Sequence, residues 1–318
     1  MSSSPATDPA TDPGADPSAD PSAAPGADPA AAGGPPAVRP RTAVLGRGEV
    51  PWDAPVAAAD DLGLSRGDGV FETLLVRGGN PARVVGLQAH LERLERSAAA
   101  LELPAPDRAA WGALARELAA GVPAGAEATL RLTLTRGAPG AGPTGLAALR
   151  PLPAETLRAR ERGVRVVALA RGTSAHLHAE APWLLGGAKT LSYAVHTAAL
   201  REAARRGADD ALFTSTEGLV LEGPTATVLW WAGGRLLTTP AGPSGILEGT
   251  TQRAVFAAAG AEGLPTGVEE VAVPGLLAAE AVWLASSVRG AVEVTHLDGT
   301  ALARRPELTR RLRGWALA

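Results

Sequence analysis

The clearest absences from this 318-residue chain are cysteine and, apart from one residue each, lysine and tyrosine. Without cysteine the chain can form no disulfide, thiolate metal site or thiol nucleophile. The five histidines include His176 and His178, which alternate along a segment that looks extended, but no third ligand spacing accompanies them. We therefore predict no metal site.

Long apolar runs are also missing. No stretch reaches the roughly 18 apolar residues that a membrane span needs. No basic start followed by an apolar stretch marks a secretory segment. These absences predict a cytoplasmic protein that does not contact a membrane.

An excess of positive charge is lacking as well. The chain has 30 Lys and Arg residues against 33 Asp and Glu, and five of the acids lie in residues 1–37. This segment repeats loose ADP and TDP units without aromatic or β-branched apolar residues, so we expect a disordered tail. The remaining 28 acidic residues (33 minus 5) nearly balance the basic ones. Such a balance argues against a nucleic-acid partner.

Strand and helix patterns intermix after the tail, which predicts an α/β or α+β fold. We expect a small N-terminal domain over 38–150, an inter-domain connection over 151–162 and a larger C-terminal domain over 163–318. The connection lies where Gly, Pro and Ala become frequent, from about 138 onward. The main predicted strands cover 67–79, 128–137, 164–170, 210–216, 219–223, 226–234 and 235–240, and the main predicted helices cover 87–103, 107–121, 189–207, 250–260 and 308–318.

Lys189 is the only lysine, so the other 29 basic residues are arginines. A buried lysine can lose its proton and become a nucleophile or base, whereas arginine stays charged. Chance survival in a sequence biased against lysine is the alternative. Tyr193 follows four residues later in a pattern of helical spacing, which would place the phenol and the amine on one face of a helix.

Two segments resemble phosphate-binding motifs but lack features that these motifs require. GAGPTG (140–145) follows a predicted strand, but Pro151 and Pro153 interrupt the helix that a dinucleotide fingerprint requires. GGAKT (186–190) resembles the end of a P-loop, yet Pro182 and Ala188 stand where glycines are needed. Neither segment predicts a nucleotide site.

Six segments occur in an order that resembles one enzyme family. They are GDGVFET, HLERL, KTLSY, the pair Glu222-Gly223, GILEGTTQR and SSVRG. Together they resemble the fold-type-IV pyridoxal-phosphate enzymes, which include branched-chain and D-amino-acid aminotransferases and aminodeoxychorismate lyases. GDGVFET and SSVRG look most like the bacterial aminodeoxychorismate lyases. The resemblance runs from about Asp60 to Gly299 and implies a homodimer of two-domain subunits with the cofactor between the domains.

The resemblance also implies roles for particular residues. Lys189 would hold pyridoxal 5'-phosphate and move protons, Glu222 would face the pyridine nitrogen, and Tyr193 would donate to the phenolic oxygen. The residues implied for the phosphate are Arg93, Gly249, Thr250, Thr251 and Ser287. Arg66 and Arg136 are candidates for substrate carboxylates, with an ordinary surface role as the alternative for each.

The implied reaction is that of an aminodeoxychorismate lyase, which converts 4-amino-4-deoxychorismate to 4-aminobenzoate and pyruvate. An aminotransferase acting on branched-chain or D-amino acids is the alternative, because both reactions begin with the same proton removal. A non-catalytic cofactor-binding or interaction protein is the third possibility. The chain departs from the family pattern at Ala226 and Thr227, where Ser-Asn is usual, and at Glu248, where proline is usual.

Overall fold

The structure, a computed structural model, describes residues 37–318. The tail predicted over 1–37 therefore lies, except for Ala37, outside the described residues. The described chain mixes helices with two sheets, so the predicted α+β class is confirmed. Among the described helices, none is long and apolar enough to cross a membrane.

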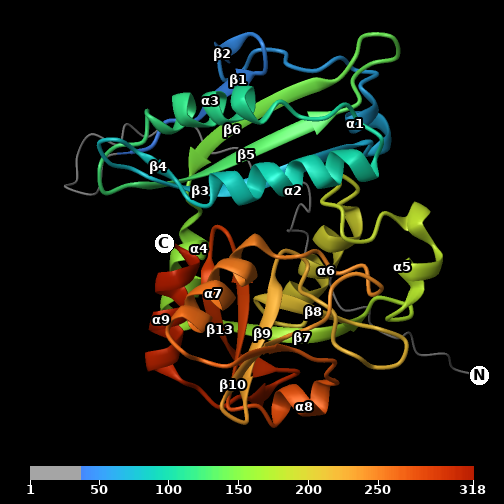
Figure 1. Cartoon of the computed structure of the whole chain (residues 1–318), viewed down its shortest axis with the longest axis vertical. Coiled ribbons are helices and arrows are strands. Elements are labelled where there is room, and N and C mark those ends of the chain that lie inside the picture. Colours follow the sequence, from blue (N-terminus) through green and yellow to red (C-terminus); the bar gives the residue numbers. More distant parts are fainter. Residues whose placement is uncertain (1–36) are drawn as a thin grey trace, which may run out of the picture. The chain divides into compact units, whose positions relative to one another are not determined.

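The first half of the described chain builds a six-stranded antiparallel sheet in the order β2-β1-β6-β5-β3-β4. Helices α2 and α3 pack on one face of it (Figure 1). Trp111, Leu118, Leu74 and Leu130 are fully buried in the core between these helices and the sheet. The elements are β1 (Arg41–Val44), β2 (Gly48–Val50), α1 (Leu62–Arg66), β3 (Gly69–Arg77), β4 (Arg83–Val84), α2 (Leu87–Ala100), α3 (Arg108–Ala119), β5 (Glu127–Thr135) and β6 (Thr144–Pro151).

Strand β3 has both faces covered over much of its length, and the alternation of its side chains decides what each face does. Val70 and Leu74 join the core with α2, and Glu72 lies on the same face. Phe71 and Thr73 point the other way and line a cavity. One strand thus contributes both to the packing with α2 and to the cavity wall.

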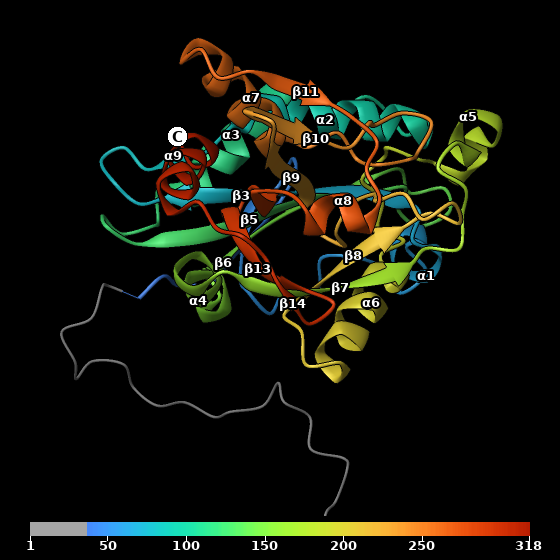
Figure 2. The ribbon, with the colours of Figure 1, turned by 90° about the horizontal axis from the view of Figure 1, so that it is seen from below.

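The second half builds an eight-stranded mixed sheet in the order β11-β10-β9-β12-β13-β7-β8, with β14 paired to β13. Helices α4 and α9 pack against β13, α6 packs on β7 and β8, and α7 packs on β11, β12 and α9 (Figure 2). The elements are α4 (Ala154–Arg162), β7 (Val164–Ala170), α5 (Leu177–Glu180), η1 (Pro182–Leu184), α6 (Ala194–Arg205), β8 (Asp210–Thr214), β9 (Thr227–Ala232), β10 (Arg235–Thr238), α7 (Thr250–Ala261), β11 (Thr266–Val268), α8 (Val273–Leu277), β12 (Ala281–Ser286), β13 (Gly290–Leu297), β14 (Thr300–Ala301) and α9 (Pro306–Ala316).

Most long elements fall where the sequence predicts them, but two predictions are wrong. The helix predicted from Lys189 begins only at Ala194, so Lys189 and Tyr193 do not share a helical face. The segment 219–223 forms isolated bridges and no strand. The Gly- and Pro-rich stretch after residue 138 contains β6 and α4, because its apolar residues alternate and pair with β5 and β1. The proposed domain division remains a prediction.

Candidate active site

The loop that carries Lys189 is held by the first residues of β3. The backbone N–H of Phe71 donates to the carbonyl of Lys189 at 3.0 Å, and that of Leu191 donates to the carbonyl of Gly69 at 2.8 Å. A Cβ at Gly69 would lie 2.7 Å from the Leu134 carbonyl oxygen on β5 and 2.7 Å from Cδ1 of Leu191 in the loop, so glycine lets β3 lie this close to both. The N–H of Lys189 itself donates to the Ser97 hydroxyl on α2 at 3.1 Å.

The Lys189 amine points into the cavity between two aromatic rings. Its Nζ lies 4.4 Å from the centre of the Phe71 ring and 5.5 Å from that of Tyr193. Burial, together with the nearby Arg93 cation, lowers the pKa of Lys189 to about 8. A substantial fraction of the amine is therefore neutral near pH 8 and able to act as a nucleophile. This proximity of amine and phenol arises from an extended loop and not from a helix.

The cavity around the amine has a volume of about 900 Å³. Glu222 lies in its wall with 8% of its surface exposed, and its Oε2 accepts the Leu247 N–H at 3.2 Å. Burial raises the pKa of Glu222 to about 7, although Arg171 pulls in the opposite direction. A carboxyl group with this pKa can hold or release a proton at neutral pH.

Tyr193 also lines the cavity, but its hydroxyl is already engaged. The O–H donates to the Pro224 carbonyl at 2.7 Å. The ring stacks on His196 with centroids 4.4 Å apart, and burial raises the pKa of Tyr193 to about 12. The phenol is thus held neutral and fixed, with oxygen lone pairs left to accept a hydrogen bond. To donate to a second group, the Tyr193 hydroxyl would have to break its hydrogen bond to the Pro224 carbonyl.

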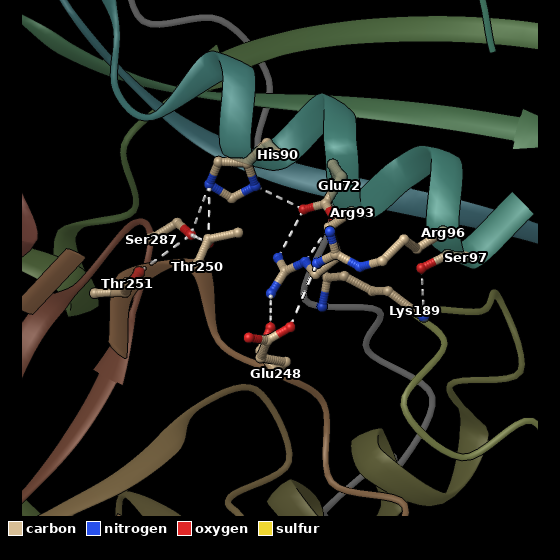
Figure 3. Close-up of polar contacts among 10 residues, drawn as sticks. All are labelled: Glu72, His90, Arg93, Arg96, Ser97, Lys189, Glu248, Thr250, Thr251 and Ser287. Atoms are coloured by element: carbon tan, nitrogen blue, oxygen red, sulfur yellow. Dashed lines mark hydrogen bonds and ion pairs between the residues drawn. The ribbon is translucent and has the colours of Figure 1, made fainter. Parts of the chain in front are cut away.

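Arg93 on α2 reaches the cavity and forms a bidentate pair with Glu72 on β3 (Figure 3). Its Nε and one terminal nitrogen lie 2.7 and 2.8 Å from the two Glu72 oxygens. The other terminal nitrogen donates to the Glu248 carbonyl at 3.0 Å. Glu72 is fully buried, so the pair fixes the guanidinium in one orientation.

Three hydroxyls gather at the start of α7. The hydroxyl oxygens of Thr250 and Thr251 lie 3.4 and 3.3 Å from that of Ser287, which follows β12. No side chain caps α7 at Gly249, so the first N–H groups of the helix are free to bind an anion. A Cβ at Gly249 would lie 2.4 Å from the Thr227 hydroxyl oxygen, which explains the glycine. We call these three hydroxyls and the start of α7 the hydroxyl cup. His90 contacts the cup through its Nε2, which lies 3.0 Å from the Ser287 oxygen.

The structure therefore brings most of the predicted site residues together around one cavity. Those that line it are Arg93, Lys189, Tyr193, Glu222, Gly249, Thr250, Thr251 and Ser287. Arg66 and Arg136 do not line it. Arg66 is exposed. The Arg136 guanidinium donates hydrogen bonds to the Asp68 carboxylate and to the Leu101 carbonyl, each at 2.6 Å. The substrate role of these two arginines therefore finds no support in the cavity lining and remains a prediction.

Other arginines line the cavity instead. The Arg131 guanidinium lies 3.9 Å over the Phe71 ring, and among the described residues no carboxylate lies within ion-pair distance of it. Arg171 has a buried terminal nitrogen without a hydrogen-bond partner among the described residues. Arg289 is already paired with Asp210 at 2.6 Å. Of these three arginines, Arg131 and Arg171 are therefore the two that are available to an anion.

Comparison with known sequences decides the family. The family model described as amino-transferase class IV matches residues 69–297. The chain belongs to this family. Class IV aminotransferases use pyridoxal phosphate, so the predicted cofactor is confirmed at the level of the family.

Two relatives with assigned activities support the same placement. A bifunctional aminodeoxychorismate lyase / D-amino acid transaminase from Mycobacterium tuberculosis is 44% identical over 79% of this chain and 89% of its own length. An aminodeoxychorismate lyase from Bacillus subtilis is 28% identical over 75% of this chain and 80% of its own length. Class IV enzymes with lyase and transaminase names are therefore both among its relatives.

Solved structures agree on the fold. The PLP-bound form of a hypothetical aminotransferase from M. tuberculosis superposes with a TM-score of 0.82, at 41% identity, over 88% of this chain and 99% of the other. A fold IV transaminase from Curtobacterium pusillum gives 0.81 at 40% identity, with the same coverage.

The donors around the cavity fit pyridoxal phosphate. A buried amine of lowered pKa suits an aldehyde, and a buried carboxyl group suits a ring nitrogen. The hydroxyls of Thr250, Thr251 and Ser287, with the uncapped start of α7, suit a phosphate.

Sequence reasoning missed the groups that support this cavity. Glu72 lies within GDGVFET and His90 within HLERL, three residues before Arg93 on the same helix face. The signal available in the sequence for His90 was its position, as a polar residue, on the apolar face of an amphipathic helix. Arg131 carried no such signal, since it alternates with Leu130 and Leu132 and so faces away from the core, as an ordinary surface residue would.

Proposed function

We propose that this class IV enzyme is an aminodeoxychorismate lyase, which releases pyruvate from 4-amino-4-deoxychorismate and leaves 4-aminobenzoate. The observation that carries the proposal is the Arg131 guanidinium, which has no carboxylate partner among the described residues and lies against the same Phe71 ring as the Lys189 amine. Both groups lie against the Phe71 ring, so a substrate whose amine would displace Lys189 from the cofactor could turn its carboxylate toward Arg131. The two lyase-named relatives add support.

In this proposal, Lys189 and Glu222 have separate roles toward the cofactor. Pyridoxal phosphate supplies an electron sink for the substrate carbon that bears the amine. Lys189 Nζ holds the cofactor and then removes the proton from that carbon. Glu222 keeps a proton on the ring nitrogen, for which its pKa of about 7 without that partner is suited. Aromaticity gained by the substrate ring drives loss of the enolpyruvyl group.

The phosphate is held, in this proposal, by Thr250, Thr251 and Ser287 with the first N–H groups of α7. Arg93 contributes through the N–H groups that Glu72 and the Glu248 carbonyl leave free. The Tyr193 ring and its stacking partner His196 form a wall beside Lys189. These contacts orient the cofactor and leave the Arg131 side of the cavity for the substrate.

A D-amino acid aminotransferase is the second candidate, because one relative bears both names and another structure is titled as bound to alpha-ketoglutarate and PMP. The two reactions share the first proton removal at Lys189. They differ in whether Lys189 afterwards returns the proton to the cofactor side, which leaves the amine on the cofactor.

The test gives the purified, cofactor-loaded enzyme either 4-amino-4-deoxychorismate or D-alanine. Formation of pyruvate and 4-aminobenzoate from the first compound supports the lyase. Conversion of the cofactor to its pyridoxamine form by D-alanine, without any product from aminodeoxychorismate, supports the aminotransferase instead. If neither compound reacts, both proposals fail. The Lys189→Ala variant is the control and should be inactive in both assays.

A further inference from the structure

His90 connects the hydroxyl cup at the start of α7 with the buried Glu72 carboxylate (Figure 3). Its Nδ1 lies 2.7 Å from Oε2 of Glu72, and its Nε2 lies 3.0 Å from the Ser287 oxygen and 3.3 Å from that of Thr250. The side chain is almost fully buried. The proposed reaction gives this histidine no part.

Glu72 decides which ring nitrogen of His90 carries the proton. Burial raises the pKa of Glu72, but hydrogen bonds from Arg93 and His90 outweigh this effect and lower it to about 2. An ionised carboxylate can only accept, so Nδ1 of His90 carries the proton and Nε2 presents a lone pair. Burial lowers the pKa of His90, although Glu72 opposes this, so the ring is neutral at neutral pH.

A neutral ring draws the hydroxyl protons away from any anion in the cup. Nε2 can only accept, so Ser287 donates to it across 3.0 Å. Thr251 in turn donates to the Ser287 oxygen across 3.3 Å. An anion needs donors, yet these two protons point along a chain that ends at His90.

Charge balance around the cup leads to the same histidine. The Arg93 cation is offset by Glu72. The Glu248 carboxylate lies outside, near the exposed Arg96 and Arg253 at 3.6 and 3.8 Å. Lys189 also faces His90, but its amine is committed to the cofactor in the loaded enzyme. Among the described residues at the cup, the start of α7 adds only a partial positive charge, so a dianion there is not fully compensated. His90 is the titratable group in contact with the hydroxyls.

We propose that His90 is a positioning residue for the cup and that it takes up one proton when a phosphate-type dianion binds at the start of α7. The proton comes from solvent and binds Nε2, which then donates to the Ser287 oxygen. The Ser287 O–H is released and turns to an anion oxygen. Nδ1–H keeps its bond to Glu72, which balances the new charge. The inference rests on the proposed phosphate site and is independent of the reaction class.

The direct test is nitrogen NMR of the full-length enzyme with ¹⁵N-labelled histidine. In the cofactor-loaded enzyme at neutral pH, both ring nitrogens of His90 should carry protons. In the cofactor-free chain, Nε2 should not. Loss of signals in His90→Gln assigns the ring. If that variant does not fold, single replacements of the other histidines (His176, His178, His196 and His296) assign it by elimination. An unprotonated Nε2 in the loaded enzyme overturns the proposal.

A second measurement uses inorganic sulfate, which stays dianionic throughout the range in which histidine titrates. Calorimetry of sulfate binding to the cofactor-free chain, in buffers of different ionisation enthalpy, gives the protons taken up. Lys189 and Glu222 also titrate near neutral pH, so the comparison with His90→Gln carries the result. The wild type should take up about one proton more than His90→Gln. As the pH rises, the sulfate affinity of the wild type should fall more steeply than that of His90→Gln, by up to about tenfold per pH unit.

The exposed histidine variant His176→Gln is the matched control and should behave as the wild type. Equal proton uptake in the wild type and His90→Gln contradicts the proposal. Neither measurement involves substrate, so a failed lyase assay leaves this test intact. Sulfate that fails to compete with the cofactor in any variant would instead refute the phosphate site itself.

Discussion

Arg131 is the residue on which the substrate proposal depends most. Its guanidinium is open to the cavity and has no carboxylate partner among the described residues, whereas Arg136 is paired with Asp68 and Arg66 is exposed outside the cavity. A charge-assisted hydrogen bond contributes about 1.5–3 kcal/mol, so Arg131→Gln should lower kcat/KM for the carboxylate substrate by about 10- to 100-fold. Steady-state kinetics with Arg66→Gln as the matched control measure this loss. Equal effects of the two replacements would show that Arg131 does not bind substrate.

Glu222 gives a second prediction at the same scale. A glutamine there cannot hold a proton on the ring nitrogen as a carboxylate does, so Glu222→Gln should bind cofactor yet lose about 100- to 1000-fold in kcat. Absorbance of the bound cofactor and single-turnover rates separate the two effects. The control Glu269→Gln removes an exposed carboxylate that pairs with Arg235. Near-normal turnover of Glu222→Gln would make Glu222 a structural residue.

Sequence alone predicts those residues whose type is unusual or whose motif is contiguous. Lys189 stands out as the single amine, and Thr250 and Thr251 fall at a recognisable helix start. Arg131 was missed because a charged residue in an alternating strand usually faces solvent. Only the register that places Arg131 beside Thr73 and near Phe71 shows that its face lines a cavity.

At the scale of elements, Glu72 links β3 to α2. Its pKa of about 2 in the folded chain lies below the value of about 4.3 expected for an unfolded chain. The stabilisation is therefore complete above about pH 4.3 and is lost as the pH falls toward 2. The wild type should lose stability across this acidic window, and Glu72→Gln should lack that part of the pH dependence.

At neutral pH the same variant leaves Arg93 buried without its counter-charge. Breaking a buried ion pair costs about 3–5 kcal/mol, so Glu72→Gln should unfold at clearly lower denaturant concentration. The control Glu49→Gln breaks the exposed pair with Arg41 and should change the free energy of unfolding by less than about 1 kcal/mol. Similar losses in both variants would mean that the buried network contributes little.

The elements themselves differ in how far sequence predicts them. The helices α2, α3, α7 and α9 follow from their apolar periodicity. The loop before α6 does not, because tertiary contacts override its helical pattern. The Leu191 N–H donates to the Gly69 carbonyl and the Phe71 N–H donates to the Lys189 carbonyl, which holds residues 189–191 extended, and Tyr193 becomes the N-cap. That override places the amine in the cavity.

At the scale of the whole molecule, we expect two copies of the chain to associate. Trp183 and Val195 line the cavity and have 74% and 65% of their surfaces exposed, which is unusual for large apolar side chains. Sedimentation velocity should give twice the mass of one chain for the wild type. Trp183→Arg should weaken association, while Val268→Arg on β11 should not. A wild type that sediments as a single chain would refute the expected homodimer.

The most direct measurement of the whole account is the location of the cofactor. The chain has one lysine, its amine lies in the cavity, and the pKa of that amine is lowered to about 8. Borohydride reduction of the purified enzyme, followed by digestion and mass spectrometry, should place a pyridoxyl group on the peptide that contains Lys189. Reduced enzyme with no such group on this peptide would contradict the assignment of Lys189 and, with it, the proposed reaction.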